Sequence, residues 1–335
     1  MIGSANGTRI GITGLGVHVP ERVVTNDDLA QHVDTSDEWI VERTGIRERR
    51  MADEHEALTD IALPAARAAL ADAGVEASDI DLLISATVTP DMMFPTSSAL
   101  MADELGAQEA AAYDLLAGCT GFVYAVVQAY GMLASGLSRR ALVVGGDVLS
   151  TILDWEDRST LVLFGDGAGA VVMEPVDRGG FLAFELGADG GGGVHLQLPG
   201  SGSRKFDHPE SLLKMNGREV YKFATRVLVS SAEAVLAEGG RTIDEVDVYV
   251  PHQANKRIID YAVGKLGVPY ERTVVNVDRF GNTSSGSIPL ALADARADGR
   301  LHDGALVLMT GMGAGLTWGS ALLEWTASPG SAGRG

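Results

Sequence analysis

ALADAGVEASDIDLLI at residues 69–84 and VLAEGGRTIDEVDVYV at residues 235–250 decide the fold, because the two stretches align without a gap when their first residues are superposed. Gly74 then falls on Gly240. Each copy has an apolar helical stretch, a glycine suited to a helix end, an acidic turn and a short apolar run typical of a buried strand. A repeat of this kind predicts that the chain consists of two similar halves.

The repeat extends beyond these two stretches. Placing Gly118 on Gly281 aligns Gly-Cys-Thr with Gly-Asn-Thr, and the same shift places Gly136 on Gly299. The order of elements is therefore expected to continue through each half. In this alignment the single cysteine of the chain, Cys119, has Asn282 as its counterpart.

Short apolar runs alternate with helical periods along the chain, which is the pattern of an α/β protein with helices packed on sheets. The predicted strands include residues 82–84, 112–116, 141–144, 181–186, 247–250 and 305–308, and the predicted helices include residues 65–73, 122–133, 220–236, 258–266 and 288–297. We predict an N-terminal half at 1–178, a C-terminal half at 179–326 and a disordered tail at 327–335. The Gly- and Ser-rich segment 187–203 is predicted to be a long loop.

Composition places the 335-residue chain among packed globular proteins, because 46% of its residues are hydrophobic and only 21% are charged. One cysteine can form neither an internal disulfide nor a Cys-rich metal site, which fits a reducing compartment. No apolar run is long enough to span a membrane, and the N-terminus lacks the pattern of a secretory signal. We therefore expect a cytoplasmic protein.

The formal charge of -19 argues against broad binding to nucleic acids or anionic membranes, since both need basic surface. An anionic partner must instead meet a local basic patch. Two groups of basic residues could form one, or could simply be solvated faces. They are Arg43, Arg47, Arg49 and Arg50, and Lys256, Arg257 and Lys265.

Cys119 lies where a predicted strand turns through Ala117-Gly118 into a long apolar helix. At such a junction the free N–H groups and the helix dipole favour negative charge, so we expect a stabilised thiolate with backbone donors for an oxyanion nearby. A lone cysteine among apolar neighbours can equally be an inert packing residue.

His252 and Asn282 also lie at strand-to-helix junctions, although the histidine could be a loop residue and the asparagine an N-cap. If the two halves face each other, all three side chains converge. They then supply one nucleophile and two hydrogen-bond donors, which suits charge developing on a thioester carbonyl oxygen. A cysteine protease also uses Cys, His and Asn, but it gives no reason for a duplicated buried sheet.

Six stretches, in order, resemble the beta-ketoacyl-acyl-carrier-protein synthase III family, and the resemblance runs from about Arg9 to Glu324. They are TSDEWIVERTGIR at 35–47, GCTGFVY at 118–124, FGDGAGA at 164–170, HQAN at 252–255, GNTS at 281–284 and GAGLTWG at 313–319. The resemblance implies a thiolase fold with two pseudo-symmetric halves in a five-layered αβαβα arrangement. It also implies a homodimer that starts type II fatty acid synthesis.

The resemblance implies a role for each matching residue. Cys119 would be acylated by a starter acyl-CoA, and His252 and Asn282 would bind the thioester carbonyl of malonyl acyl carrier protein as carbon dioxide leaves. The backbone N–H groups of Cys119 and Ala314 would form the oxyanion hole. No metal or redox cofactor is implied. Many members of the family have Gly at the position of Ala314.

The remaining roles concern substrate and carrier binding. The implied CoA-binding residues are Thr35, Trp39, Arg43, Arg158, Gly217 and Asn255, although Thr35 and Glu38 also have the spacing of a capping box. The implied carrier-protein patch consists of Lys222, Lys256, Arg257 and Lys265. Phe94 resembles a residue that lines the acyl pocket of the partner subunit.

Four other functions are weighed against this one. A related enzyme with the same nucleophile could start a polyketide, or could transfer an acyl group in secondary metabolism without decarboxylation; the presence of Asn282 favours decarboxylation. A biosynthetic thiolase needs a second reactive cysteine, which this chain lacks. A catalytically silent dimeric scaffold would not require Cys119, His252 and Asn282 together. The sequence does not decide which starter acyl group is used.

Overall fold

Two sheets with a pair of helices between them form the centre of the computed structural model, which describes residues 7–200, 202–204 and 211–326. The first sheet has the order β1-β7-β6-β4-β5 and the second has the order β11-β12-β13-β8. Their strands are β1 (Arg9–His18), β4 (Leu82–Ala86), β5 (Ala111–Leu115), β6 (Ala141–Asp147), β7 (Gly167–Val176), β8 (Gly180–Ala188), β11 (Val248–Pro251), β12 (Leu306–Gly313) and β13 (Thr317–Glu324).

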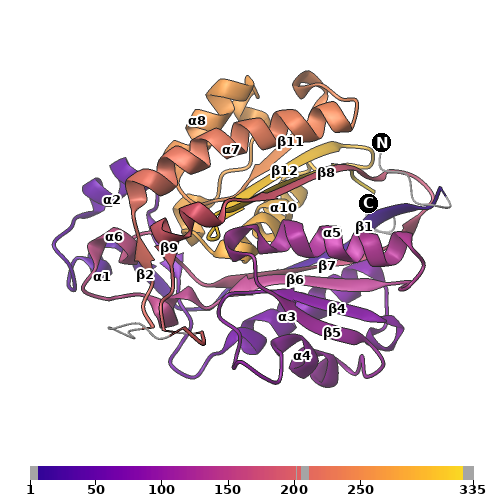
Figure 1. Cartoon of the computed structure of the whole chain (residues 1–335), viewed down its shortest axis with the longest axis horizontal. Coiled ribbons are helices and arrows are strands. Elements are labelled where there is room, and N and C mark those ends of the chain that lie inside the picture. The colour runs from indigo at the N-terminus through magenta and orange to yellow at the C-terminus, as the bar shows by residue number, and fades with distance from the viewer. Residues whose placement is uncertain (1–6, 201, 205–210, 327–335) are drawn as a thin grey trace.

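Helices complete five layers (Figure 1). The middle layer consists of α5 (Gly121–Ala134) and α10 (Ser287–Ala297), whose apolar side chains share one core with both sheets. The outer layers consist of α3 (Leu58–Ala73) and α4 (Ser97–Leu105) on the first sheet, and α7 (Gly217–Glu238) and α8 (Lys256–Leu266) on the second. The predicted five-layered αβαβα fold is confirmed.

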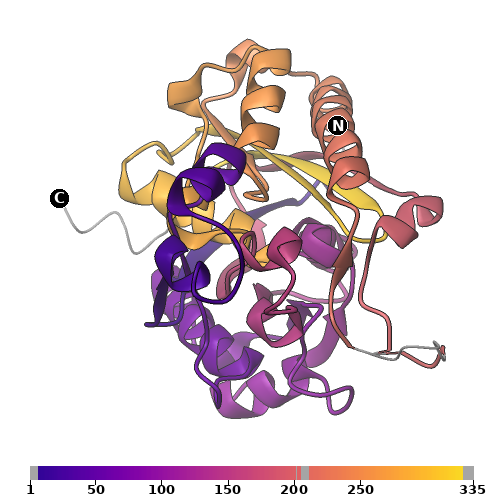
Figure 2. The same cartoon turned by 90° about the vertical axis from the view of Figure 1, so that its left-hand side faces the viewer.

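The shorter elements gather at one end of the molecule, on the left in Figure 1 and facing the viewer in Figure 2. There the indigo helices lie beside the orange α8, and the Asn255 side chain donates a hydrogen bond to the Arg43 carbonyl. These elements are β2 (Val23–Thr25), α1 (Asn26–Leu29), α2 (Asp37–Thr44), β3 (Glu48–Arg50), α6 (Arg158–Leu161), β9 (Leu196–Gln197), β10 (Lys214–Met215) and α9 (Val277–Phe280).

The internal repeat is present in the backbone. Gly74 and Gly240 both have positive φ, 67° and 63°, as glycine readily allows. Each is followed by a 3₁₀ turn, at Ala77–Asp79 and Ile243–Glu245, and then by the strand β4 or β11. The order β1-β7-β6-β4 in one sheet matches β8-β13-β12-β11 in the other, with the same parallel and antiparallel pairings.

The strand β5 has only a trace of a counterpart, a parallel bridge between Tyr249 and Thr273. The division into halves at residues 178 and 179 stays a prediction, and the predicted tail at 327–335 lies outside the described residues. Within the described ranges, no helix combines the length and apolar character that crossing a membrane requires.

Two expectations about the fold are wrong. The segment 187–203 is not one long loop, because β8 runs to Ala188 and a 3₁₀ helix at Gly190–His195 leads into β9, which pairs with β10. Arg49 belongs to neither a basic patch nor a solvated face, because it is completely buried.

The buried guanidinium of Arg49 is held by oxygen acceptors. It donates hydrogen bonds to the Val24 carbonyl, to Asn26 Oδ1 and to the Val162 carbonyl, at 3.3, 2.8 and 2.9 Å. Burial lowers the pKa of Arg49 to about 10, so the side chain remains charged at neutral pH. Arg49 therefore ties the end of the molecule that carries α1 to the segment that contains Val162.

Candidate active site

One pocket of about 220 Å³ brings the predicted catalytic residues together. Cys119, His252 and Asn282 all line it, although they come from different halves of the chain. Each side chain follows a strand or precedes a helix of the central layers, which explains why three distant positions meet. The predicted convergence of the three residues agrees with this geometry.

Cys119 lies in a 3₁₀ turn at Gly118–Thr120, directly before α5. The turn depends on Gly118, whose φ of 57° lies in the left-handed region, and Gly281 before Asn282 has a similar φ of 65°. The 3₁₀ turns that lead into α5 and α10, however, begin at Gly118 and Ser284, which have similar φ of 57° and 51°. In the structure Ser285 therefore occupies the position of Cys119, and Asn282 lies three residues before it, so the alignment of Cys119 with Asn282 is wrong at this turn.

Burial raises the pKa of the Cys119 thiol to about 12. The nearby Ser284 hydroxyl, which has no hydrogen-bond partner among the described residues, and the N–H of Cys119 itself lower this pKa, but they do not offset the desolvation, and the carboxylate of Asp147 adds to the rise. The direction of this shift opposes the expected stabilised thiolate, although the Cys119 residue itself is only partly buried. The sequence identified the helix start correctly, but the cost of burying the charge is larger than the effect of the donors.

His252 directly follows β11 and is only 1% exposed. Its Nδ1 lies 2.5 Å from Ser287 Oγ, whereas its Nε2 is buried with no hydrogen-bond partner among the described residues. Burial lowers the pKa of His252 from 6.5 to about 3, so the ring is neutral at neutral pH. A neutral imidazole with a free buried nitrogen in this pocket can offer one hydrogen bond to a substrate.

Asn282 is held by its backbone and by its side-chain oxygen. Its N–H donates to the Leu163 carbonyl at 2.8 Å, and its carbonyl accepts from Gly165 N–H at 3.0 Å. Its Oδ1 accepts a hydrogen bond from the N–H of Ser284 at 2.9 Å, which leaves the amide NH₂ as the group able to bind a ligand. The alternative role of Asn282 as N-cap of α10 does not hold, because that position is Gly286.

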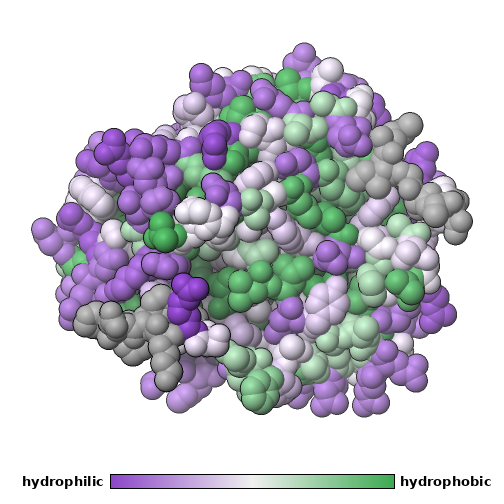
Figure 3. Space-filling view, in the orientation of Figure 1, coloured by the Kyte–Doolittle hydropathy of each residue, from purple (hydrophilic) through white to green (hydrophobic). Residues whose placement is uncertain are grey.

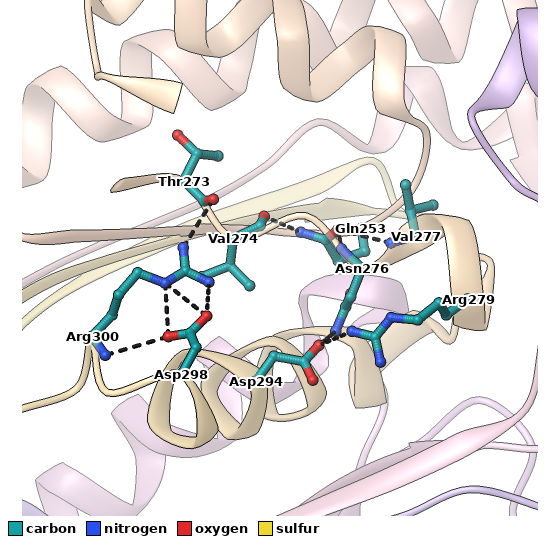
Figure 4. A network of polar contacts seen from close by, with 9 residues as sticks. All are labelled: Gln253, Thr273, Val274, Asn276, Val277, Arg279, Asp294, Asp298 and Arg300. Atoms are coloured by element: carbon teal, nitrogen blue, oxygen red, sulfur yellow. Dashed lines mark hydrogen bonds and ion pairs between the residues drawn. The ribbon is translucent and has the colours of Figure 1, made fainter. Parts of the chain in front are cut away.

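Gln253, the residue after His252, is hydrogen-bonded to the segment that precedes α9 (Figure 4). Its buried side chain donates to the carbonyls of Pro251 and Val274 and accepts from the N–H groups of Asn276 and Val277. All four bonding sites of the amide are used. The end of β11 is thereby joined to the segment that leads through α9 to Asn282.

The same segment is anchored to α10 and the turn after it. Asp294 accepts hydrogen bonds from Asn276 and Arg279, both at 2.7 Å, and Arg300 joins Asp298 to the Thr273 carbonyl (Figure 4). These bonds attach the segment that leads to Asn282 to α10, a helix of the middle layer.

The end of β12 lies against the nucleophile turn. A Cβ atom added to Gly118 would lie 2.7 Å from the backbone nitrogen of Ala314, and one added to Gly313 would lie 2.5 Å from that of Cys119. Both distances are too short for real side chains. The backbone nitrogens of Cys119 and Ala314 can therefore approach each other closely only because glycine occupies positions 118 and 313.

Aromatic and basic side chains line the other part of the pocket. The guanidinium carbons of Arg158 and Arg43 lie 4.7 and 5.5 Å from the centre of the Trp39 ring. Arg158 also donates to the Asp34 carbonyl at 2.6 Å. Of the predicted CoA-binding residues, five line the pocket: Trp39, Arg43, Arg158, Gly217 and Asn255.

Thr35 is the exception, because it is not among the residues that line this pocket. Its Oγ1 is buried with no partner among the described residues. The capping box predicted from Thr35 and Glu38 is wrong, since Ser36 is the N-cap of α2. The Ser36 hydroxyl accepts a hydrogen bond from the backbone N–H of Trp39 at 3.2 Å.

The predicted carrier-protein residues lie on α7 and α8. Lys222 and Lys265 line one groove together with Arg226, which sequence reasoning missed. Arg257 lies over the ring of Tyr221, a pocket residue. Two of the four are in ion pairs within their own helices: Lys222 with Glu219 at 2.7 Å and Lys256 with Asp260 at 2.8 Å.

Phe94 precedes α4 and is 81% exposed. A second cavity, of about 310 Å³, lies on the far side of the nucleophile turn and is lined by Gly118, Ala314 and apolar side chains that include Val88 and Leu116. Phe94 does not line this cavity within its own chain.

Sequence reasoning also missed two serines beside the catalytic residues. Ser284 has a φ of 51°, a conformation that costs energy for any residue except glycine, and its buried hydroxyl lies where it lowers the pKa of both Cys119 and Asp147. Ser287 contacts His252. Neither contact has a signal in the sequence, because each joins segments that are far apart in the chain.

Comparison with known proteins relates the whole chain to one family. Family models for the 3-oxoacyl-[acyl-carrier-protein] synthase III domain and its C-terminal domain match residues 113–190 and 236–325. The beta-ketoacyl-[acyl-carrier-protein] synthase III of Symbiobacterium thermophilum is 54% identical over 94% of this chain and 98% of its own length.

Two solved structures have the same fold. The synthase III of Thermus thermophilus has a TM-score of 0.91 and 48% identity, over 95% of this chain and all of that chain. The priming beta-ketosynthase of the R1128 polyketide pathway has a TM-score of 0.91 and 37% identity, over 98% of this chain and 99% of that chain. With half of its residues identical over nearly its full length, this chain belongs to the beta-ketoacyl-acyl-carrier-protein synthase III family.

Proposed function

We propose that this protein condenses an acyl group from acyl-CoA with malonyl acyl carrier protein, giving 3-ketoacyl carrier protein, carbon dioxide and CoA, and so starts type II fatty acid synthesis. The observation that carries the proposal is the single pocket shared by Cys119, His252 and Asn282, with Trp39 and Arg158 on its wall. A cytoplasmic location stays a prediction from the sequence.

The first step loads the enzyme. Cys119 Sγ attacks the thioester carbonyl of acyl-CoA, the new S–C bond forms, the bond from carbon to the CoA sulfur breaks, and the thiol proton passes to the leaving CoA thiolate. Because burial raises the pKa of the Cys119 thiol, loss of the proton as the bond forms is favoured over ionisation beforehand. The N–H groups of Cys119 and Ala314 hold the tetrahedral oxyanion.

The second step makes the carbon nucleophile. His252 Nε2–H and the Asn282 NH₂ donate hydrogen bonds to the malonyl thioester oxygen. When the bond between the α-carbon and the carboxylate breaks, carbon dioxide leaves and the electron pair remains as an enolate, whose negative oxygen these two donors stabilise. The enolate carbon attacks the acyl-Cys119 carbonyl, and the Cys119 sulfur leaves and takes up a proton. The electron pair released by decarboxylation stays within the substrate and no external oxidant or reductant is needed, so the proposal includes no redox cofactor.

The pocket wall suits CoA. An adenine ring can stack on the Trp39 indole and under the Arg158 guanidinium, while Arg43 can pair with phosphate. Arg158 already covers Trp39, so a base must displace it and break its hydrogen bond to the Asp34 carbonyl. Gly217 and Asn255 would follow along the pantetheine arm, and Thr35 would act from outside the pocket wall.

Carrier protein and a second subunit are the proposed macromolecular partners. An acidic carrier would meet Lys222, Arg257 and Lys265 near the pocket, with Lys256 beside them, on a protein that is otherwise strongly acidic. For the homodimer, the supporting features are the edge position of β5 and the hydrophobic area in the middle of the face in Figure 3. Phe94 of each subunit would then close the acyl cavity of its partner.

A polyketide starter enzyme is the second candidate, because the R1128 priming beta-ketosynthase has the same fold with 37% identity. Both functions use the same chemistry at Cys119. They differ in the carrier protein that is accepted and in the starter acyl group.

The proposal is tested by intact-mass spectrometry. The purified protein is mixed with a panel of acyl-CoA thioesters and then with malonyl carrier protein of either pathway. We expect an acyl adduct that Cys119→Ala abolishes, followed by release of a 3-ketoacyl carrier protein.

The His252→Ala and Asn282→Ala variants should still be acylated but should decarboxylate malonyl carrier protein about a hundredfold more slowly. The matched control is His302→Ala, which removes an exposed histidine outside the pocket. Absence of the adduct in the wild-type protein contradicts the proposed function, and normal decarboxylation by both variants contradicts the proposed roles.

A further inference from the structure

Ser287 is the first residue of α10, but its hydroxyl bonds to the segment after β11 instead of to its own helix. Its Oγ lies 2.5 Å from His252 Nδ1 and 3.3 Å from the backbone nitrogen of Gln253. The side chain is 1% exposed. No side chain caps α10, so helix capping does not explain the serine.

The donors and acceptors at this hydroxyl can be assigned. The N–H of Gln253 can only donate, so Ser287 Oγ accepts that hydrogen bond. Among the hydrogen bonds of the described residues, His252 Nδ1 is then the acceptor available for the hydroxyl hydrogen. If Nδ1 carried a proton and donated it instead, the hydroxyl hydrogen would have no acceptor at this buried position.

We propose that Ser287 is a positioning residue that holds His252 as the tautomer with its proton on Nε2. The inference rests on the proposed function, because it concerns the hydrogen bond that His252 gives to the malonyl thioester. When Nδ1 accepts a hydrogen bond from Ser287, the ring proton of the neutral imidazole must be on Nε2.

The position of this proton decides whether His252 helps or opposes the reaction. His252 lines the same pocket as Cys119. Its Nε2 atom is buried and has no hydrogen-bond partner among the described residues. With its proton, it donates to the oxygen on which negative charge develops. Without its proton, it presents a lone pair to that oxygen and raises the energy of the enolate.

The variants compare the hydroxyl with its absence. Ser287→Ala removes the hydroxyl, and Ser287→Thr keeps it. Ser231→Ala is the matched control, because Ser231 is also a buried hydroxyl, at 2% exposure, but it bonds to Glu185 and Ser320 on the outer side of the second sheet. Each protein is measured by ¹⁵N NMR of the His252 ring, by acylation of Cys119, and by the rate of malonyl carrier protein decarboxylation.

We expect Ser287→Ala to lower kcat for decarboxylation about tenfold to a hundredfold. The lower limit is the effect of losing one buried hydrogen bond, and the upper limit is the effect of losing an oxyanion donor. Its Cys119 acylation should stay within about twofold of wild type, since Nδ1 takes no part in that step. The NMR spectrum should move toward the Nδ1–H form. Ser287→Thr should restore the Nε2–H form and most of the rate, and Ser231→Ala should change neither.

The inference is overturned if Ser287→Ala keeps a pure Nε2–H spectrum, whatever its rate, or if it decarboxylates like wild type. The NMR measurement needs no substrate, so it decides the role of Ser287 even if the wild-type protein fails to condense. A wild-type protein without condensation would contradict the proposed function alone.

Discussion

Replacing Gly118 by Ala tests whether the backbone of the nucleophile turn matters for catalysis. The substitution adds one methyl group at a residue whose φ is 57°. That methyl would lie 2.7 Å from the backbone nitrogen and 2.9 Å from the carbonyl oxygen of Ala314. Backbone atoms cannot rotate away as a side chain can, so the turn and the end of β12 must move apart.

The cost has two parts. A left-handed conformation costs about 1–2 kcal/mol for alanine, and forcing a methyl group into a packed backbone contact costs about 1–3 kcal/mol. The free energy of unfolding should therefore fall by about 2–5 kcal/mol in total. Moving Ala314 N–H out of hydrogen-bond range of the oxyanion should slow Cys119 acylation about a hundredfold or more.

Gly74→Ala provides the matched control. Gly74 also has a positive φ, 67°, but an added Cβ meets nothing within 4 Å. It should lose only the conformational part, about 1–2 kcal/mol, and keep full activity. Urea unfolding measures the stability of each variant, and time-resolved intact-mass spectrometry with acyl-CoA measures acylation. If Gly118→Ala is acylated as fast as Gly74→Ala, the oxyanion role of this turn is refuted.

Three further predictions follow from the pocket. Alkylation of Cys119 by iodoacetamide should keep accelerating from about pH 7 to about pH 10, because the thiol pKa is about 12; a plateau near neutral pH contradicts this. Burial lowers the pKa of His252 from 6.5 to about 3, so the unfolded chain binds a proton that the folded protein does not. The free energy of unfolding is therefore unaffected by this group above pH 6.5, and it falls by about 1.4 kcal/mol for each unit that the pH drops from 6.5 toward 3. Urea unfolding of His252→Gln should lack this part of the slope, and equal slopes would argue against a neutral His252. Trp39→Ala and Arg158→Ala should each raise KM for acyl-CoA about tenfold, with little change in kcat, because each removes one face of the base site; an unchanged KM in initial-rate kinetics rules out the stacking site.

The sequence alone predicted the fold and the convergence of Cys119, His252 and Asn282 in one pocket. Gly74 and Gly240 identified the repeat, and the alignment of Cys119 with Asn282 indicated that two junctions would face each other. Periodicity and glycine placement are local properties, so they can be read from one sequence. The structure confirms both repeat glycines with nearly equal φ.

The failures of prediction concern properties that depend on tertiary contacts. The pKa of Cys119 depends on how deeply the thiol is buried, which the sequence around it does not state. The contact of Ser287 with His252 joins two segments, and a serine at a helix start ordinarily suggests a cap. Arg49 was grouped with its basic neighbours as a partner patch or a solvated face, yet three oxygen acceptors hold it inside the protein.

The origin of the pocket residues in two different repeat copies has a consequence for folding kinetics. Cys119 comes from the first copy, whereas His252, Asn282 and Ala314 come from the second. Each sheet can form its own hydrogen bonds before the two sheets dock through α5 and α10, and pairings between distant segments form slowly. During refolding, circular dichroism should therefore recover before Cys119 can be acylated, and the delay between the two signals measures the docking of the halves.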